Sequence, residues 1–151
     1  GKPKSGKTTI AGTYPKPLLY VSVGNDGGGR VLAKTQGIFV KNLRNDFVRK
    51  KTTIELLAEI LAELRKPGAD KFKTIVIDTI GALQDDYKQY LEFTKGGRAL
   101  SQQEWGDVSK MMLSIKDTMK RFSEEMGVQF VWLTHNMKRL DLTKRYASYL
   151  T

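Results

Sequence analysis

The first eight residues carry the most specific chemical signal in this sequence. They read Gly-Lys-Pro-Lys-Ser-Gly-Lys-Thr and fit G-x-x-x-x-G-K-[ST], a pattern typical of loops that bind the phosphates of a nucleotide. Successive backbone N–H groups turn inward around the anion, and Gly1 and Gly6 permit the backbone angles that this requires. Lys7 is expected to reach the β- and γ-phosphates, and the Thr8 hydroxyl to ligate Mg²⁺. The predicted nucleotide contacts are Gly1, Lys4, Ser5, Gly6, Lys7, Thr8 and Thr9. The alternative is a glycine- and lysine-rich surface turn.

A carboxylate, Asp78, ends the β-prone run of residues 72–78. An acid in that position can hold Mg²⁺, often through a water molecule, next to the Thr8 hydroxyl. The alternative interpretation is that Asp78 is the N-cap of a helix beginning near Ile80.

Two further polar residues follow predicted strands and complete the candidate catalytic set of Lys7, Asp26, Asp78 and His135. Asp26 lies in the glycine-rich stretch 24–29 and can orient and deprotonate the water that attacks the γ-phosphate. His135 follows the run 128–134 and can contact the γ-phosphate and report its presence to a mobile segment. The alternatives are an Asp-Gly turn for Asp26 and a histidine paired with a neighbouring carbonyl or carboxylate for His135.

Apolar periodicity predicts the elements that must position these residues. Strands are expected at 18–23, 37–40, 72–78 and 128–134. Helices are expected at about 6–12, from Thr52 or Thr53 to Pro67, from 80 to 91, and from 105 to 126 with a stop at Gly127. Strands alternating with helices predict one domain, 1–151, with a three-layer α/β/α fold and a mostly parallel sheet. Ligands of such sheets bind beyond the carboxyl ends of the strands, so the polar strand ends should converge. A strand should precede Gly1 to aim the phosphate loop, and we expect a partial domain that is incomplete at both ends.

Composition narrows the classes of partner. The 151 residues include 26 Lys and Arg against 16 Asp and Glu, a formal net charge of +10 that favours a polyanionic partner such as nucleic acid. The absence of cysteine excludes disulfides and thiol catalysis. No apolar run approaches the ~20 residues of a membrane span, so a cytoplasmic protein is expected. Candidate DNA contacts, or alternatively solvated surfaces, are Arg49-Lys50-Lys51, residues 95–98, Lys138-Arg139 and Lys144-Arg145-Tyr146.

Taken together, the phosphate loop, Asp26, Asp78 and His135 resemble the RecA-like branch of P-loop ATPases. More particularly, the sequence resembles phage-encoded RecA-like ATPases of the single-strand-annealing group, the AAA-type phage nucleotide-binding protein family. The matching pieces are residues 1–9, Pro15–Leu19, Asp26–Gly28, 72–79, Gln103-Glu104-Trp105-Gly106 and Thr134-His135. The sequence departs from RecA in carrying Asp26 in place of a glutamate and His135 in place of a glutamine.

This resemblance implies a DNA-stimulated ATPase that uses ATP and Mg²⁺ and acts on single-stranded DNA in phage-type recombination or annealing. It also implies an oligomer with nucleotide between subunits, in a bacterial cell, and a single-strand DNA-binding protein as a further partner. Two alternatives stay open. One is a nucleotide-gated DNA-binding module with little turnover, and the other is a P-loop small-molecule kinase whose lid would be the loop 94–103 with Arg98.

Overall fold

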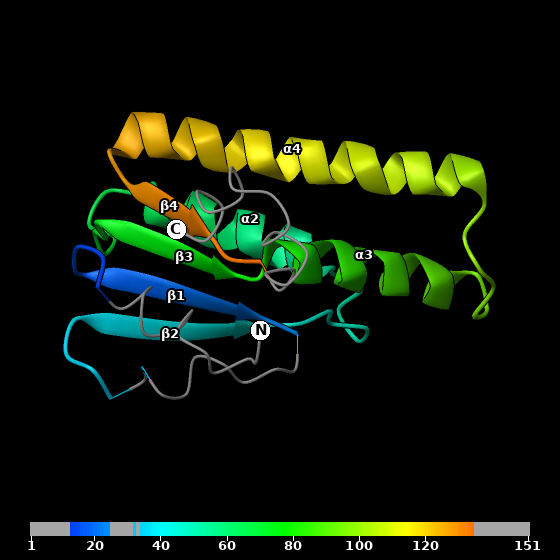
Figure 1. The fold of residues 1–151 in the computed structure, drawn as a ribbon, viewed down its shortest axis with the longest axis horizontal. Helices are drawn as coiled ribbons and strands as arrows, with labels where there is room; N and C mark the ends of the chain where they lie inside the picture. Colours follow the sequence, from blue (N-terminus) through cyan, green and yellow to red (C-terminus); the bar gives the residue numbers. More distant parts are fainter. Residues whose placement is uncertain (1–12, 25–31, 33, 135–151) are drawn as a thin grey trace, which may run out of the picture.

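Four strands lie side by side in one parallel sheet in the computed structural model, which describes residues 13–24, 32 and 34–134 (Figure 1). The strands are β1 (Leu18–Val23), β2 (Ile38–Leu43), β3 (Thr74–Asp78) and β4 (Gln129–Trp132). Their spatial order is β2-β1-β3-β4, and every neighbouring pair is parallel. All four carboxyl ends therefore meet at one edge of the sheet, as the sequence predicted.

Strand boundaries follow from how each strand is buried. β1 and β3 contain only buried residues, which explains their nearly continuous apolar sequences. β2 extends to Leu43, three residues beyond the predicted end at Val40. It is an edge strand, and its exposed Lys41 and Asn42 hide the strand from an analysis based on apolar runs.

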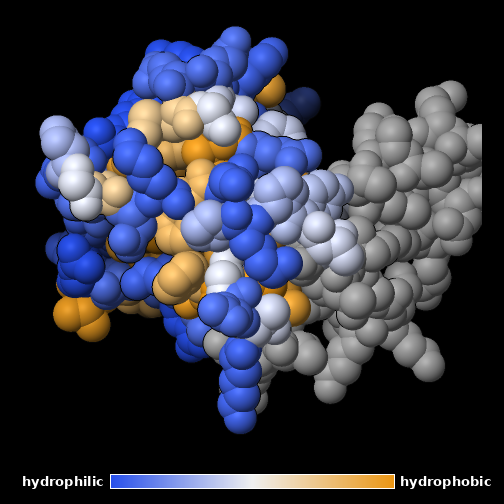
Figure 2. Space-filling view, turned by 90° about the vertical axis from the view of Figure 1, so that its left-hand side faces the viewer, coloured by the Kyte–Doolittle hydropathy of each residue, from blue (hydrophilic) through white to orange (hydrophobic). Residues whose placement is uncertain are grey.

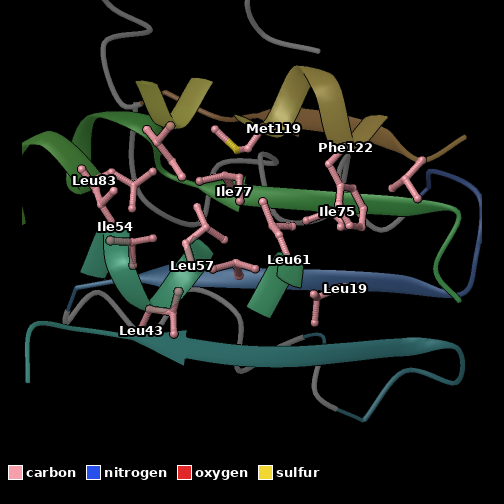
Figure 3. Packing of buried hydrophobic residues seen from close by; sticks show 14 of the residues in the cluster. Leu19, Leu43, Ile54, Leu57, Leu61, Ile75, Ile77, Leu83, Met119 and Phe122 are labelled. Atoms are coloured by element: carbon pink, nitrogen blue, oxygen red, sulfur yellow. The ribbon is translucent and has the colours of Figure 1, made fainter. Parts of the chain in front are cut away.

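Three helices pack on one face of the sheet and enclose the main core (Figure 3). They are α2 (Thr53–Leu64), α3 (Ile80–Thr94) and α4 (Gln102–Met126). Leu57 of α2 and Met119 of α4 meet Ile75 and Ile77 of β3 in this core. Met112 and Met119 of α4 therefore belong to the core, and Met111 and Met126 pack against it.

The opposite face of the sheet is also covered, since Leu18, Tyr20 and Val76 are fully buried there. The helix predicted at 6–12 lies outside the described residues. Figure 2 views the molecule from the amino ends of the strands, where hydrophilic residues surround small apolar patches. Among the described residues, no helix has the length and apolar character needed to cross a bilayer.

Local sequence signals set the helix ends. Thr52 is the N-cap of α2 and forms a capping box with Glu55, so the first of the two predicted caps is confirmed. Gly127 ends α4 with φ of 67°, a left-handed conformation that glycine adopts without steric cost. Ser101 and Glu104 form a second capping box at the start of α4.

Glu104 ties the loop between α3 and α4 to the helix that follows. Its carboxylate pairs with Lys95 and lies 3.6 Å from the Arg98 guanidinium. The hydrogen bond from Lys95, followed by that from the Ser101 amide, lowers the pKa of Glu104 from 4.5 to about 2. The folded state therefore stabilises the ionised form of Glu104 relative to the unfolded chain.

This lowered pKa predicts a loss of stability in acid. The contribution of Glu104 should be complete above pH 4.5, the ordinary pKa, and should disappear as the pH falls towards about 2. Glu104→Gln should therefore lower the urea midpoint at pH 7 and have a much smaller effect at pH 2.5. Glu124→Gln, at an exposed site near the other end of α4, is the matched control. An equal effect of Glu104→Gln at both pH values would contradict this assignment.

Candidate functional site

The neighbouring strands β1 and β3 bring the Tyr20 hydroxyl and the Asp78 carboxylate together. Asp78 is the last residue of β3 and pairs in register with Ser22 of β1. The Asp78 side chain is almost completely buried, and its Oδ2 accepts a hydrogen bond from the Tyr20 hydroxyl. A carboxylate is therefore held in one orientation at the edge where ligands of parallel sheets bind.

Tyr20 is a component of this site that the sequence analysis missed. It lies in the middle of β1 and is fully buried on the face of the sheet opposite α2, α3 and α4. The available signal was a hydroxyl-bearing ring within the otherwise aliphatic Leu18–Val21 run, because a buried Tyr O–H needs an acceptor. Which acceptor it finds depends on the neighbouring strand, and that pairing is tertiary information.

The alternative role for Asp78 as a helix N-cap is wrong. Thr79 is the N-cap of α3, and its side-chain oxygen accepts the Ala82 N–H at 3.2 Å. The Asp78 carboxylate faces Tyr20 instead. The capping residue and the acid are therefore two different residues, Thr79 and Asp78. The Asp78 carboxylate is not used for capping, which is compatible with its predicted role as a Mg²⁺ ligand at the strand end.

A second carboxylate, Asp86 of α3, lies near the end of β1 and was not predicted. Its Oδ1 is 4.0 Å from the position that a Cβ on Gly24 would occupy, where the glycine-rich stretch begins. Its Oδ2 accepts the Thr53 hydroxyl proton at 2.7 Å, and its backbone oxygen accepts from Asn45 Nδ2 at 2.7 Å. Burial raises the pKa of Asp86 despite the bond from Thr53. In the sequence Asp86 looks like an ordinary polar residue of an amphipathic helix.

Trp105 and Gly106 are among the residues that match the phage family in sequence, and they lie near the start of α4. The Lys88 ammonium stands over the Trp105 ring, 5.5 Å from its centroid, so Trp105 links α4 to α3. A Cβ on Gly106 would meet no atom within 4 Å. Within the described residues, no neighbouring segment therefore comes so close to α4 that position 106 requires a glycine.

Most of the predicted site lies outside the described residues. This applies to Gly1, Lys4, Ser5, Gly6, Lys7, Thr8 and Thr9, and also to Asp26 and His135. Their predicted roles stay predictions. Asp78 is the predicted site residue whose surroundings the structure describes.

The donor chemistry at Asp78 suits Mg²⁺. Magnesium prefers oxygen ligands and is commonly held by one or two carboxylates together with phosphate oxygens and water. Asp78 offers an oriented carboxylate, and the Thr8 hydroxyl is the expected second protein ligand. Within the described ranges, no group of three or more His, Cys, Asp or Glu residues forms a separate metal site.

The parallel α/β sheet, with an acid at the end of an inner strand, is consistent with the core of P-loop nucleoside triphosphatase-like proteins. A model of the AAA domain family matches residues 1–149. The chain therefore belongs to the AAA domain family, whose members are nucleotide-binding ATPases that use ATP and Mg²⁺. Comparisons with curated proteins and with solved structures found no match.

Proposed function

We propose that this protein is a RecA-like ATPase that acts on single-stranded DNA in phage-type recombination or annealing. The observation that carries the catalytic part is the buried Asp78, oriented by Tyr20 at the carboxyl end of β3 in a chain of the AAA domain family. The proposal extends to an oligomer that binds nucleotide between its subunits, with a single-strand DNA-binding protein as a further partner.

Each residue of the proposed site has a separate task. Lys7 and the amides of the phosphate loop bind the β- and γ-phosphates, while Thr8 and Asp78 hold Mg²⁺. The metal ion, when bound, neutralises charge on the phosphate oxygens. Asp26 positions the attacking water, and His135 contacts the γ-phosphate. Tyr20 keeps the Asp78 carboxylate in place, because its hydroxyl donates to Oδ2.

The DNA part of the proposal is supported by charge. The formal net charge of +10 favours a polyanion, and Arg49 and Lys50 lie exposed on the connection between β2 and α2. Phosphate contacts by Lys and Arg are independent of base sequence, which suits a protein acting on single strands of any sequence.

Nucleotide binding by the full chain is the first test of this proposal. Lys7→Ala should weaken ATP binding by about 100-fold or more, because the ammonium is expected to contact the β- and γ-phosphates. Isothermal titration with a non-hydrolysable ATP analogue measures this affinity. Lys73→Ala, an exposed lysine just before β3 at the other end of the sheet, is the control and should bind like the wild type. Equal affinity in Lys7→Ala and wild type would refute the nucleotide site.

The rate of ATP hydrolysis, measured with and without single-stranded DNA, distinguishes a DNA-stimulated ATPase from a nucleotide-gated DNA-binding module with little turnover. A DNA-stimulated ATPase releases phosphate faster when an oligonucleotide is present. A nucleotide-gated module would bind ATP and DNA with little turnover in either condition, and that result would overturn the enzymatic assignment while leaving the binding site intact.

A further inference from the structure

Three aromatic rings form an exposed cluster near the carboxyl end of β2. Phe47, in the connection from β2 to α2, stacks on Tyr90 of α3 with ring centroids 5.6 Å apart and 12° between the ring planes. Phe93 lies one turn further along α3, and its ring centroid is 4.6 Å from that of Phe47. Phe47 is 45% exposed, Phe93 61% and the adjacent Val48 93%. We call Phe47, Tyr90 and Phe93 the aromatic platform.

The loop that carries Phe47 has a defined conformation. Asp46 and Lys51 exchange both backbone hydrogen bonds, at 2.8 and 2.9 Å, and close residues 47–50 into a tip. The Arg49 amide donates to Asp46 Oδ1 at 2.9 Å. Asn45 anchors the base of the loop, since it bonds the Asp86 backbone oxygen and the Thr53 amide. In Figure 1 this connection lies beside α3.

Cationic residues flank Phe47 in the sequence. The segment 44–51 contains Arg44, Arg49, Lys50 and Lys51 and the acid Asp46, and Lys51 is paired with Glu59 of α2. Arg49 and Lys50 are exposed at the tip, directly after Phe47 and Val48. The Asp46 carboxylate accepts the Arg49 amide, and Glu92, the nearest acid in sequence to Phe93, is paired with Lys88. The exposed tip therefore carries two cations, Arg49 and Lys50.

Packing explains only part of this cluster. Phe47 and Tyr90 hold the loop against α3, but Phe93 and Val48 leave most of their surface in water. Lys50 also adopts φ of 59°, a conformation that usually costs a non-glycine residue about 1 kcal/mol. Exposed rings beside exposed cations match what unpaired bases and their phosphates require, namely stacking surfaces and positive charge.

We infer that the aromatic platform and the tip 47–50 form a binding site for single-stranded DNA, in which bases stack on Phe93 and Phe47 while Arg49 and Lys50 contact phosphates. This inference rests on the proposed function and assigns its DNA partner to a particular surface. The site is connected to the candidate ATP site through α3, which begins directly after Asp78 and Thr79 and carries Tyr90 and Phe93 near its end.

The test compares two exposed phenylalanines in the full chain. Phe93→Ala should weaken binding of a fluorescently labelled oligo-dT by roughly 5- to 150-fold, because it removes a stacking surface. Phe39→Ala is the matched control. Phe39 is 56% exposed and also contacts one ring, that of Phe72 at 5.6 Å, but it lies near the amino end of β2. This variant should bind like the wild type.

A second comparison separates stacking from charge. An abasic oligonucleotide keeps the phosphates and removes the bases, so Phe93→Ala should bind it as the wild type does. Lys50→Gly should weaken both oligonucleotides and reduce the slope of log K against log salt by about 0.7. Glycine adopts the backbone angle of Lys50 without strain, so this variant should keep its thermal stability, and a loss of binding cannot be attributed to unfolding.

Each outcome decides the inference. If the wild type binds oligo-dT and Phe93→Ala binds it equally well, DNA binding stands and this site is wrong. If Phe93→Ala changes only the oligomeric state, measured by light scattering, the platform is an interface between copies and the inference is also wrong. If the wild type does not bind single-stranded DNA at all, the DNA part of the proposed function fails together with the site, while ATP binding remains separately measurable.

Discussion

Asp78→Asn is expected to lower the rate of ATP hydrolysis by about 100-fold or more while leaving the protein folded. The amide has nearly the shape of the carboxylate and can still accept from the Tyr20 hydroxyl. It lacks the negative charge with which Asp78 is proposed to hold Mg²⁺ at the end of β3. Because the metal neutralises charge that the phosphates carry during transfer, its loss acts on turnover more than on folding. Phosphate release at saturating ATP, measured over a range of Mg²⁺ concentrations, checks this expectation.

Tyr20→Phe should produce a smaller effect of the same kind. It removes the hydroxyl that orients Asp78 and leaves the buried ring in place. Partners that position a metal ligand typically contribute 10- to 100-fold in metal affinity or activity, so roughly a 10-fold rise in the Mg²⁺ concentration for half-maximal rate is expected. Asp85→Asn, an exposed carboxylate of α3 next to Asp86, is the control and should hydrolyse ATP normally. For the first variant, Asp78→Asn, a rate of ATP hydrolysis equal to that of the wild type would show that Asp78 is not a catalytic residue.

Leu57→Ala should destabilise the protein by about 2–5 kcal/mol, the largest stability change that we predict for a single substitution. Leu57 of α2 has no exposed surface and belongs to the main core together with Ile75 and Ile77 of β3 (Figure 3). Its truncation removes buried apolar surface and leaves a cavity that the surrounding elements can fill only in part. Since small domains are stable by only about 5–15 kcal/mol, the variant should be close to unfolding at moderate temperature.

The same chemical change at Leu113 of α4 provides the comparison. Leu113 is 66% exposed, so Leu113→Ala should change the unfolding free energy by no more than about 0.5 kcal/mol. Urea denaturation followed by circular dichroism measures both variants. Equal destabilisation at the two positions would mean that the core does not lie between α2, α4 and the sheet.

Elements with strong periodicity and clear end signals could be predicted from the sequence. β1 was predicted with the bounds that the structure has. Gly127 was identified as the stop of α4, and the N-cap of α2 was narrowed to Thr52 or Thr53, of which the structure has Thr52. These features depend on neighbours within about one helical turn, which local sequence contains. The end of β2 was less accessible, because an edge strand can present polar side chains to water and lose its apolar signature.

Residue types and spacing in the sequence alone determined the phosphate-loop pattern, the alternation of strands and helices, and the acid at the end of β3. Only the tertiary structure decided that Tyr20 donates to Asp78, that Thr79 instead of Asp78 caps α3, and that Phe47 stacks on Tyr90. The residues in the Tyr20–Asp78 pair are 58 positions apart. Such contacts depend on which strands become neighbours and in which register, and this is settled by the packing of the whole sheet and its helices.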